Sequence, residues 1–411
     1  MKISNGVKIN TDSKKIKEIL ERGIEQVIDK KNLLKKLKSG KKLRIKLGID
    51  PTGPKIHLGR AIQLWKLRNF QDLGHQIVFI IGDFTGQIGD ASDKQAMRKP
   101  LTEEEIKENL RTYKKQIGKI LDLKKVEFHR NSEWLSKLKI KDFLSLAMSF
   151  TAQQMIQRRN FRERWEQNKP IGLHELSYPL LQGYDSVMIK ADVEIGGFDQ
   201  LFNLKMGREM QRIFGQPPQD IMTSQMLYGL DGRKMSTSWG NVINITYNPR
   251  NMYGKIMSMK DELIEDYLKL TTRFPLKKIE KIKKDLKEEK LNPKEAKSIL
   301  AKEIIKMYHS KKAGETAEKE FNRVFREKKL PLKIPVFKSS KKSLPILDLL
   351  TKANLASSKN EAKRLILQGG VSIRIKNQEL RIKDWRQDIK LKNGMILQVG
   401  KRKFLKIRLV K

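Results

Sequence analysis

One segment in the first quarter of the chain constrains the fold more than any other. Apolar and polar residues alternate along 43–49, which is the period-two pattern of a strand. The prolines and the glycine of residues 50–54 end that strand, because they cannot continue a hydrogen-bonded ladder. Apolar residues then recur at helical spacing along 60–73, and 76–82 is continuously apolar, as a strand buried on both faces would be. Strand, helix and strand in this order predict a right-handed parallel βαβ unit.

Further short apolar runs predict strands at 126–128, 193–195 and 221–222. We therefore predict an α/β fold with a doubly wound, Rossmann-like parallel sheet in residues 1–245. A mostly helical insertion, at about 102–190, is expected to separate the two halves of this domain.

The composition changes after the sheet domain. Residues 246–327 are strongly charged and rich in helix formers, and Asn292, Pro293 and Glu295 suit the cap and first turn of a helix. An α-helical domain is therefore predicted there. Residues 328–343 contain prolines, lysines and serines but no acidic residue, which is typical of a basic linker.

The last segment, 344–411, is small and basic, with 17 lysines and arginines against five aspartates and glutamates. A capping box formed by Ser358 and Glu361 is expected to start a helix in it. A glycine pair at 369–370 then leads into the alternating strand 371–375. We predict a small α+β domain at this end of the chain.

The charge of the whole chain indicates a polyanionic partner. Lysine and arginine number 88 against 47 aspartates and glutamates, a formal charge of +41. Clustered cations bind nucleic acid by releasing its counterions, so a nucleic acid is the favoured partner. A lysine-rich surface that reflects genome composition is the alternative.

Several classes of protein are not expected. The chain has no cysteine, which excludes disulfides, thiolate nucleophiles and cysteine-based zinc sites. Its five histidines form no His-Glu-x-x-His pattern, so no protein-bound metal is expected. The first residues lack the apolar core of a signal peptide, and the apolar run 77–81 is too short to span a membrane. We expect a soluble, cytoplasmic protein with no membrane partner.

Two short stretches, far apart in the chain, predict a nucleotide site: residues 57–60 (His-Leu-Gly-Arg) and 234–238 (Lys-Met-Ser-Thr-Ser). No Walker A loop is present. A histidine beside a helix N-terminus is an alternative phosphate site, because the helix dipole favours negative charge. A lone histidine there more often only caps the helix. Lys234, in a glycine-flanked loop, is suited to holding pyrophosphate. Because both features occur in one chain, a phosphate site becomes the favoured interpretation of the histidine.

With these motifs, the chain resembles bacterial tyrosyl-tRNA synthetases, which are class I aminoacyl-tRNA synthetases, over nearly its whole length. The most specific stretches are 178–185 (Tyr-Pro-Leu-Leu-Gln-Gly-Tyr-Asp) and 195–200 (Ile-Gly-Gly-Phe-Asp-Gln), followed by Asn203. Tyr178, Gln182 and Asp185 are spaced to share one helix face. Pro179 is expected in the first turn of that helix, where a missing N–H is tolerated.

The resemblance implies a set of site residues. Those expected to bind L-tyrosine are Lys46, Asp90, Tyr178, Gln182, Asp185 and Gln200. Those expected to bind ATP are Gly48, Asp50, His57, Gly59, Arg60, Gly197, Asp199, Lys234, Met235 and Ser236. Thr52 and His57 would stabilise the pentavalent phosphate, and Lys234 would hold the pyrophosphate.

Within that set, Asp90, Tyr178 and Gln182 would hold the substrate ammonium. Asp185 would accept a hydrogen bond from the phenol, because a buried carboxylate that phenylalanine left unpaired would be costly. Lys46 stands where many bacterial members have a tyrosine that also meets the phenol. Mg²⁺ would arrive with ATP, since it keeps several waters and binds substrate phosphates.

The last segment resembles the S4 RNA-binding domain. Residues expected to bind RNA are Ser358, Lys359, Lys363, Arg364 and Gln368. The resemblance implies that this domain and the helical domain contact the anticodon arm and variable arm of tRNA(Tyr), through backbone phosphates and shape. It also implies a homodimer formed by the helical insertion, at about 130–190, with the tRNA crossing between subunits.

Two residues depart from the family pattern. Arg60 replaces the second histidine of the first motif, and Thr237 replaces the second lysine of Lys-Met-Ser-Lys-Ser. Losing one charge-assisted phosphate contact costs about 1.5–3 kcal/mol, or about one to two powers of ten in rate. We therefore expect a working but slow enzyme, unless another cation such as Arg233 compensates.

The expected function is that of a tyrosine–tRNA ligase, which makes tyrosyl-adenylate and transfers tyrosine to the 3′ end of tRNA(Tyr). Two alternatives remain. A non-catalytic RNA-binding paralogue is favoured only by Arg60 and Thr237. A tryptophanyl-tRNA synthetase shares the Tyr-Pro helix, but the turn 196–200, Asn203 and the S4-like tail fit the tyrosine branch better.

Overall fold

The computed structural model describes residues 8–90, 101–233, 235, 237, 239–325, 327, 330–331, 334–375, 378–400 and 403–410. The chain divides into two compact units, Met1–Gly314 and Glu315–Lys411, and each is described by itself. Lys234 and Ser236, two of the residues expected to bind ATP, lie outside the described residues.

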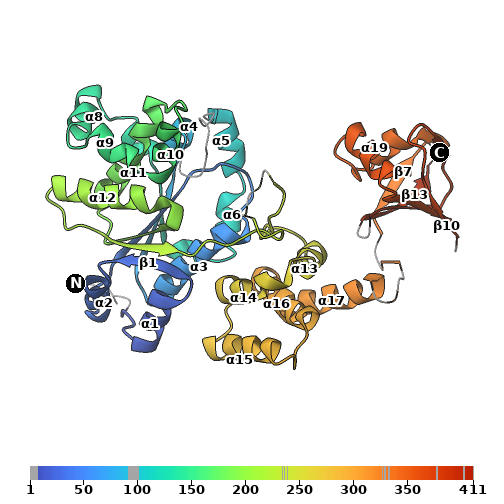
Figure 1. The fold of residues 1–411 in the computed structure, drawn as a ribbon, viewed down its shortest axis with the longest axis horizontal. Coiled ribbons are helices and arrows are strands. Elements are labelled where there is room, and N and C mark those ends of the chain that lie inside the picture. Colours follow the sequence, from blue (N-terminus) through green and yellow to red (C-terminus); the bar gives the residue numbers. More distant parts are fainter. Residues whose placement is uncertain are drawn as a thin grey trace, which may run out of the picture. The chain divides into compact units, whose positions relative to one another are not determined.

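The first unit, drawn in blue to orange in Figure 1, is built on a six-stranded sheet in the order β1-β6-β5-β2-β3-β4. The strands are β1 (Ile24–Ile28), β2 (Arg44–Ile49), β3 (Gln76–Ile81), β4 (Val126–Arg130), β5 (Val193–Gly197) and β6 (Asp220–Ser224). All neighbours are parallel except β1, which pairs antiparallel with β6. The strand order reverses direction between β2 and β5. The predicted doubly wound α/β fold is thereby confirmed.

Helices cover both faces of this sheet. In chain order they are α1 (Ser13–Glu21), α2 (Lys30–Lys38), α3 (Leu58–Asp72), α4 (Thr85–Ile88), α5 (Glu103–Leu110), α6 (Tyr113–Ile117), α7 (Ser132–Leu135), α8 (Ile140–Ala147), α9 (Ala152–Ile156), α10 (Arg159–Glu166), α11 (Leu173–Met188) and α12 (Leu201–Ile213). Short 3-10 turns occur at Leu123–Lys125 and Phe198–Gln200. The right-handed crossovers from β2 to β3 and from β5 to β6 run in opposite directions along the sheet, so α3 and α12 lie on opposite faces.

The register between β2 and β3 decides which side chains face α11. Lys46 pairs with Val78, and Gly48 pairs with Ile80. Val78 and Ile80 pack in one buried cluster with Leu181 of α11. Side chains alternate along a strand, so Lys46 lies on the same face as these residues. The polar side chains of α11 therefore meet β2 at this face.

Helix α3 begins at Leu58, two residues earlier than the apolar pattern indicated, because His57 caps it. The ring Nδ1 of His57 accepts a hydrogen bond from the backbone N–H of Arg60 at 3.4 Å. At the other end Gly74 has a φ of 96°, the left-handed conformation in which glycine ends a helix.

The prediction for Pro179 is wrong. Helix α11 begins at Leu173, so Pro179 lies in its second turn and not in the first. The helix starts early because its first turn is fixed by Glu175, whose carboxylate accepts the N–H of Gly172 at 2.9 Å and pairs with buried Arg164 at 2.7 Å.

The remaining helices of the first unit follow β6. They are α13 (Pro249–Met257), α14 (Ile264–Thr271), α15 (Leu276–Lys287) and α16 (Pro293–Tyr308), with a 3-10 turn at Asp261–Leu263. The predicted cap is present, since the Asn292 side chain accepts the N–H of Glu295 at 3.1 Å. Helix α17 (Lys311–Phe325) spans the boundary between the units.

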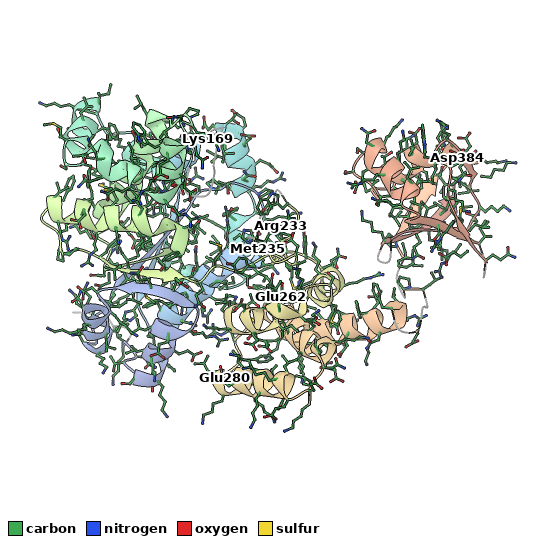
Figure 2. All side chains as sticks on the ribbon, in the orientation of Figure 1. Lys169, Arg233, Met235, Glu262, Glu280 and Asp384 are labelled. Atoms are coloured by element: carbon green, nitrogen blue, oxygen red, sulfur yellow. The ribbon has the colours of Figure 1, made fainter. Side chains whose placement is uncertain are left out.

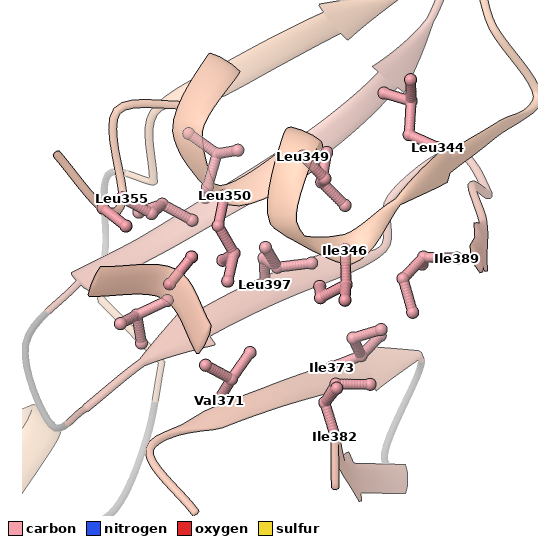
Figure 3. Close-up of a cluster of buried hydrophobic side chains, with 14 of the residues drawn as sticks. Leu344, Ile346, Leu349, Leu350, Leu355, Val371, Ile373, Ile382, Ile389 and Leu397 are labelled. Atoms are coloured by element: carbon pink, nitrogen blue, oxygen red, sulfur yellow. The ribbon is translucent and has the colours of Figure 1, made fainter. Parts of the chain in front are cut away.

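In the described part of the second unit, two sheets and two helices follow the end of α17. A five-stranded sheet has the order β10-β9-β12-β13-β7, and β8 pairs with β11. The elements are β7 (Val336–Ser339), β8 (Ser343–Pro345), α18 (Ile346–Lys352), α19 (Lys359–Leu367), β9 (Val371–Ile375), β10 (Gln378–Arg381), β11 (Asp388–Lys390), β12 (Ile396–Val399) and β13 (Lys403–Leu409). Figure 3 shows Leu349 and Leu350 of α18 packed over Val371 and Leu397 of the sheet.

Two details of this unit differ from expectation. Strand β7 lies inside the segment 328–343 predicted as a linker, because it adds to the sheet edge in parallel with β13. Ser358 caps α19 through the N–H of Glu361 at 3.2 Å, but the Glu361 carboxylate accepts from the Ser357 backbone instead of closing the box. Across both units, none of the helices that the structure describes has the length and apolar character needed to span a membrane.

Candidate active site

A cavity of about 570 Å³ opens where the strand order reverses, at the carboxyl ends of β2 and β5. This is the position in which doubly wound sheets bind ligands. The lining includes most residues that the sequence singled out: Gly48, Asp50, Thr52, His57, Gly59, Arg60, Asp90, Tyr178, Gln182, Asp185, Gly197, Asp199, Gln200 and Met235. Lys46 does not line it. Thr237 does.

Main-chain bonds join the segment that contains the first motif to residues 243–245, which follow the second motif along the chain. The Leu58 N–H donates to the carbonyl of Ile243 at 2.9 Å, and the Ile245 N–H donates to the carbonyl of Ile56 at 2.9 Å. A Cβ added to Gly59 would lie only 3.4 Å from the sulfur of Met235, which is labelled with Arg233 in Figure 2. Met235 therefore lies over the first motif.

His57 is a neutral hydrogen-bond donor in this setting. Burial, together with the positive charge of Arg60, lowers the pKa of His57 to about 3. Its Nδ1 accepts the Arg60 N–H, so the single ring proton resides on Nε2. The imidazole can therefore donate from Nε2 to a phosphate oxygen without carrying charge.

Arg60 is fixed at both ends of its guanidinium. One nitrogen donates to the hydroxyl of Tyr113 at 2.9 Å, and the other donates to the hydroxyl of Thr52. Tyr113 lies on α6 and is buried. Nothing in the sequence pointed to Tyr113, which lies 53 residues beyond its partner.

Arg233, the candidate substitute for the missing lysine, is engaged elsewhere. Its guanidinium pairs with Asp231 at 2.6 Å and lies 5.0 Å from the ring centre of Trp239. The hydrogen bond from Asn241, and then the contact with Arg233, lower the pKa of Asp231. Arg233 does not line the cavity.

Asp185 forms a buried polar wall of the cavity. Its carboxylate accepts the indole N–H of Trp134 at 2.8 Å and the amide of Asn131 at 3.3 Å. Burial raises the pKa of Asp185 to about 7, against the lowering effect of Lys46. Both donors follow β4, and neither was singled out in the sequence.

Asp90 and Tyr178 are already paired. Asp90 accepts from Arg158 at 2.8 Å and from Gln200 at 2.7 Å. The hydroxyl of Tyr178 donates to Asp50 at 2.9 Å, and burial raises the pKa of Tyr178 well above its usual value. Charged partners therefore hold these side chains in fixed positions.

Asn203 extends the same network. Its amide donates to Gln182 at 2.9 Å and to Gln200 at 3.1 Å. The structure thus brings Asp90, Gln182 and Gln200 into one connected group, although they lie on three separate segments. Such a network orients its members more firmly than isolated bonds would.

Lys46 is placed behind the cavity. Its ammonium is buried, pairs with Glu194 at 2.8 Å, and donates to Ser186 at 2.7 Å and to the carbonyl of Gln182 at 3.2 Å. Glu194 lines the cavity, whereas Lys46 does not. Lys46 therefore neutralises the charge of Glu194 from behind the cavity and does not face its interior.

Among the described residues there is no group of three or more histidines or acids arranged to hold a metal.

Comparisons with known proteins agree with this arrangement. A family model described as class I tRNA synthetases (W and Y) matches residues 38–326. The tyrosine–tRNA ligase of Carboxydothermus hydrogenoformans is 47% identical over 401 residues, which cover 95% of this chain and 97% of that protein. The enzyme of that name from Thermotoga maritima is 45% identical over 391 residues, covering 95% and 96%.

A solved structure gives the same result. The tyrosyl-tRNA synthetase of Archaeoglobus fulgidus, complexed with L-tyrosine, superposes with a TM-score of 0.60 at 26% identity. The match covers 74% of this chain and 98% of that one. The fold is thus that of a class I tRNA synthetase. Within that class, the chain belongs to the tyrosyl-tRNA synthetase family.

Proposed function

We propose that this chain is a tyrosine–tRNA ligase whose chemistry takes place in the cavity between β2 and β5. One observation carries the assignment of the site. Asp185, expected to meet the phenol, lines the same cavity as His57 and Met235 of the two nucleotide motifs. A substrate bound to Asp185 can therefore reach a nucleotide held by those motifs.

The reaction has two steps. The carboxylate of L-tyrosine attacks the α-phosphorus of ATP, a carboxyl–phosphate bond forms, and the bond to pyrophosphate breaks. The 3′-terminal hydroxyl of tRNA(Tyr) then attacks the acyl carbon, and AMP leaves. In the first step charge develops on the phosphate oxygens, so fixed donors around them supply most of the catalysis.

The residues divide between the two substrates. Asp185 accepts from the phenol, and Asp90, Tyr178 and Gln182 surround the ammonium. His57 donates to the α-phosphate from Nε2, while Gly48 leaves room for the adenosine. A Cβ on Gly48 would meet no atom within 4 Å, which supports an open space beside that backbone. Mg²⁺ enters as part of the ATP complex.

The second unit supports binding of tRNA(Tyr). Ser358, Lys359, Arg364 and Gln368 are exposed on α19 or at its ends. Lys363 lies 4.2 Å from the ring centre of Trp385, and Lys359 pairs with Asp348 at 2.6 Å. Exposed cations on one helix suit contacts with backbone phosphates.

We place the reaction in the cytoplasm, where tRNA charging takes place.

A homodimer formed through the helical insertion is also proposed. Ile140 and Leu144 of α8 and Met148, which caps its end, recur every four residues on one face and are 80%, 56% and 86% exposed. Trp165 and Leu173 add exposed apolar surface to the insertion. Apolar faces of this kind are typical of interfaces between subunits.

We expect Leu144→Glu to separate the dimer. A charge placed in an apolar interface loses its hydration without gaining a partner, so the subunits part. Light scattering should then give 47.9 kDa, the mass of one chain, instead of twice that value. Leu380→Glu, an equally exposed leucine of the second unit, should leave the dimer intact. If the wild type and Leu144→Glu have the same mass in solution, whether of one chain or of two, the proposed interface is contradicted.

The exchange of pyrophosphate into ATP tests the function. Wild-type protein should catalyse it when L-tyrosine is present and not when L-tryptophan replaces tyrosine. Exchange with tryptophan would indicate the other enzyme of the family model. Absence of exchange with every amino acid, together with tight binding of tRNA(Tyr), would instead favour the RNA-binding paralogue.

The ionisation of Asp185 predicts how tyrosine binding changes with pH. Its carboxyl accepts the phenol hydrogen far more strongly when it is ionised, and burial raises its pKa to about 7 in the folded protein. The ionised fraction therefore grows as pH rises from 6 to 8. We expect the KM for tyrosine to fall by about tenfold across that range. The KM for ATP should change little, and Asp185→Asn should remove the dependence.

A further inference from the structure

The charge of the described cavity is unsuited to a polyphosphate except at one point. Five acidic side chains line it: Asp50, Asp90, Asp185, Glu194 and Asp199. Among the described lining residues, Arg60 is the single permanent cation, since guanidinium groups stay protonated throughout the range of protein assays. His57 is neutral because its pKa is lowered to about 3. The charge that faces ATP on this side thus depends on Arg60.

Arg60 is held in place before any ligand arrives. Its two terminal nitrogens donate to Tyr113 and Thr52, and a guanidinium has five N–H donors in all. Donors therefore remain for phosphate oxygens. Tyr113 is 1% exposed, so its hydroxyl is a rigid support. A donor that is fixed in advance costs no reorganisation when charge develops on the phosphate.

The two departures from the family motifs concern the same cavity. The first motif has gained a permanent cation at Arg60, where the family has a histidine. The second motif has lost one at Thr237, where the family has a lysine. Both side chains line the cavity described above. The number of cations in the two motifs is therefore unchanged, although the charge has moved from a loop to the start of α3.

We propose that Arg60, oriented by Tyr113, supplies to the ATP polyphosphate the positive charge that Thr237 cannot supply. This inference rests on the proposed function, because it assigns roles within the same nucleotide site. Arg60 contacts the substrate, and Tyr113 is a positioning residue that acts through it. Compensation of this kind means that the enzyme is not slowed by the absence of the lysine.

A double-mutant cycle of Arg60→His and Thr237→Lys tests the proposal. Arg60→His should lower the rate of tyrosyl-adenylate formation by about ten- to hundredfold, the effect of losing one charge-assisted contact. Thr237→Lys alone should change the rate by less than about threefold. The double variant should recover most of the lost rate, because the charge returns to the loop. Equal effects of Thr237→Lys in both backgrounds would overturn the proposal.

Tyr113→Phe tests the positioning role. It should lower the adenylation rate by several-fold in wild type and have no further effect in the Arg60→His background. A purely structural role of Tyr113 would instead give the same loss in both backgrounds. The KM for tyrosine should stay constant throughout. Arg68→His, on the same helix α3 and outside the cavity, is the matched control and should not couple to Thr237→Lys.

Binding of ATP alone gives a second measurement. By calorimetry, Arg60→His should weaken ATP binding, and adding Thr237→Lys should restore it. If wild-type protein binds ATP but exchanges no pyrophosphate with tyrosine, the proposed function fails, while the binding cycle still decides the role of Arg60. Unchanged ATP affinity and unchanged rate in Arg60→His would refute the inference even in an active enzyme.

Discussion

Replacing Asp185 with asparagine is expected to reduce kcat/KM for tyrosine by about ten- to hundredfold. The variant loses a hydrogen bond from the phenol to a charged acceptor, which contributes about 1.5–3 kcal/mol. The indole of Trp134 can still donate to the new amide oxygen, so the wall should keep its shape. Tyrosine-dependent pyrophosphate exchange measures the loss directly.

The same variant should accept phenylalanine better than the wild type does. Phenylalanine leaves the buried carboxylate of Asp185 without a partner, and an amide is less costly to leave unpaired. The ratio of activity on tyrosine to activity on phenylalanine should therefore collapse. Glu127→Gln is a suitable control, because Glu127 pairs with Arg44 at 2.7 Å and lies outside the cavity. If the ratio in Asp185→Asn equals that of the wild type, Asp185 does not meet the phenol.

Replacing His57 with asparagine should lower kcat for adenylate formation by about a hundred- to a thousandfold. Removing one fixed donor to an oxyanion has an effect of that size. The KM values for tyrosine and ATP should change little, since the bond strengthens only in the transition state. Single-turnover formation of tyrosyl-adenylate is the appropriate measurement.

Asparagine is chosen because it preserves the other role of His57. It is among the best helix caps, so α3 keeps its first turn while the imidazole is lost. His57→Ala loses both the cap and the phosphate donor. The difference in melting temperature between His57→Asn and His57→Ala therefore measures the contribution of the cap. A large rise in the KM for ATP at constant kcat would show that His57 binds the ground state instead. Because the pKa of His57 is about 3, its contribution should be constant between pH 6 and pH 9.

Local sequence patterns predicted every strand of the six-stranded sheet except β1, and the residues that cap α16 and α19. The alternation along 43–49 and the apolar run at 76–82 correspond to β2 and β3, because burial on a sheet imposes those patterns directly. The residues that support the site were not predictable in this way. Trp134 and Asn131 reach Asp185 across more than 50 residues of chain, and each alone resembles an ordinary buried residue.

The early start of α11 has a similar cause. The rule that proline belongs in the first turn is local, whereas the pairing of Glu175 with Arg164 depends on how α10 packs against α11. Tyr113 and Arg158 were missed for the same reason, since their importance lies in partners distant in the chain. Side chains that hold others in position therefore have no local sequence pattern by which they could be predicted from one sequence.

The buried pair of Lys46 and Glu194 limits how the amino-acid specificity of this protein could be redesigned. Glu194 lines the cavity and Lys46 cancels its charge from behind. Changing either residue alone, to enlarge the cavity for a bulkier amino acid, would leave the other charge buried without a partner. The cost would be about 3–5 kcal/mol in folding stability. Libraries for new substrates should therefore vary the two positions together, with neutral residues of matched volume.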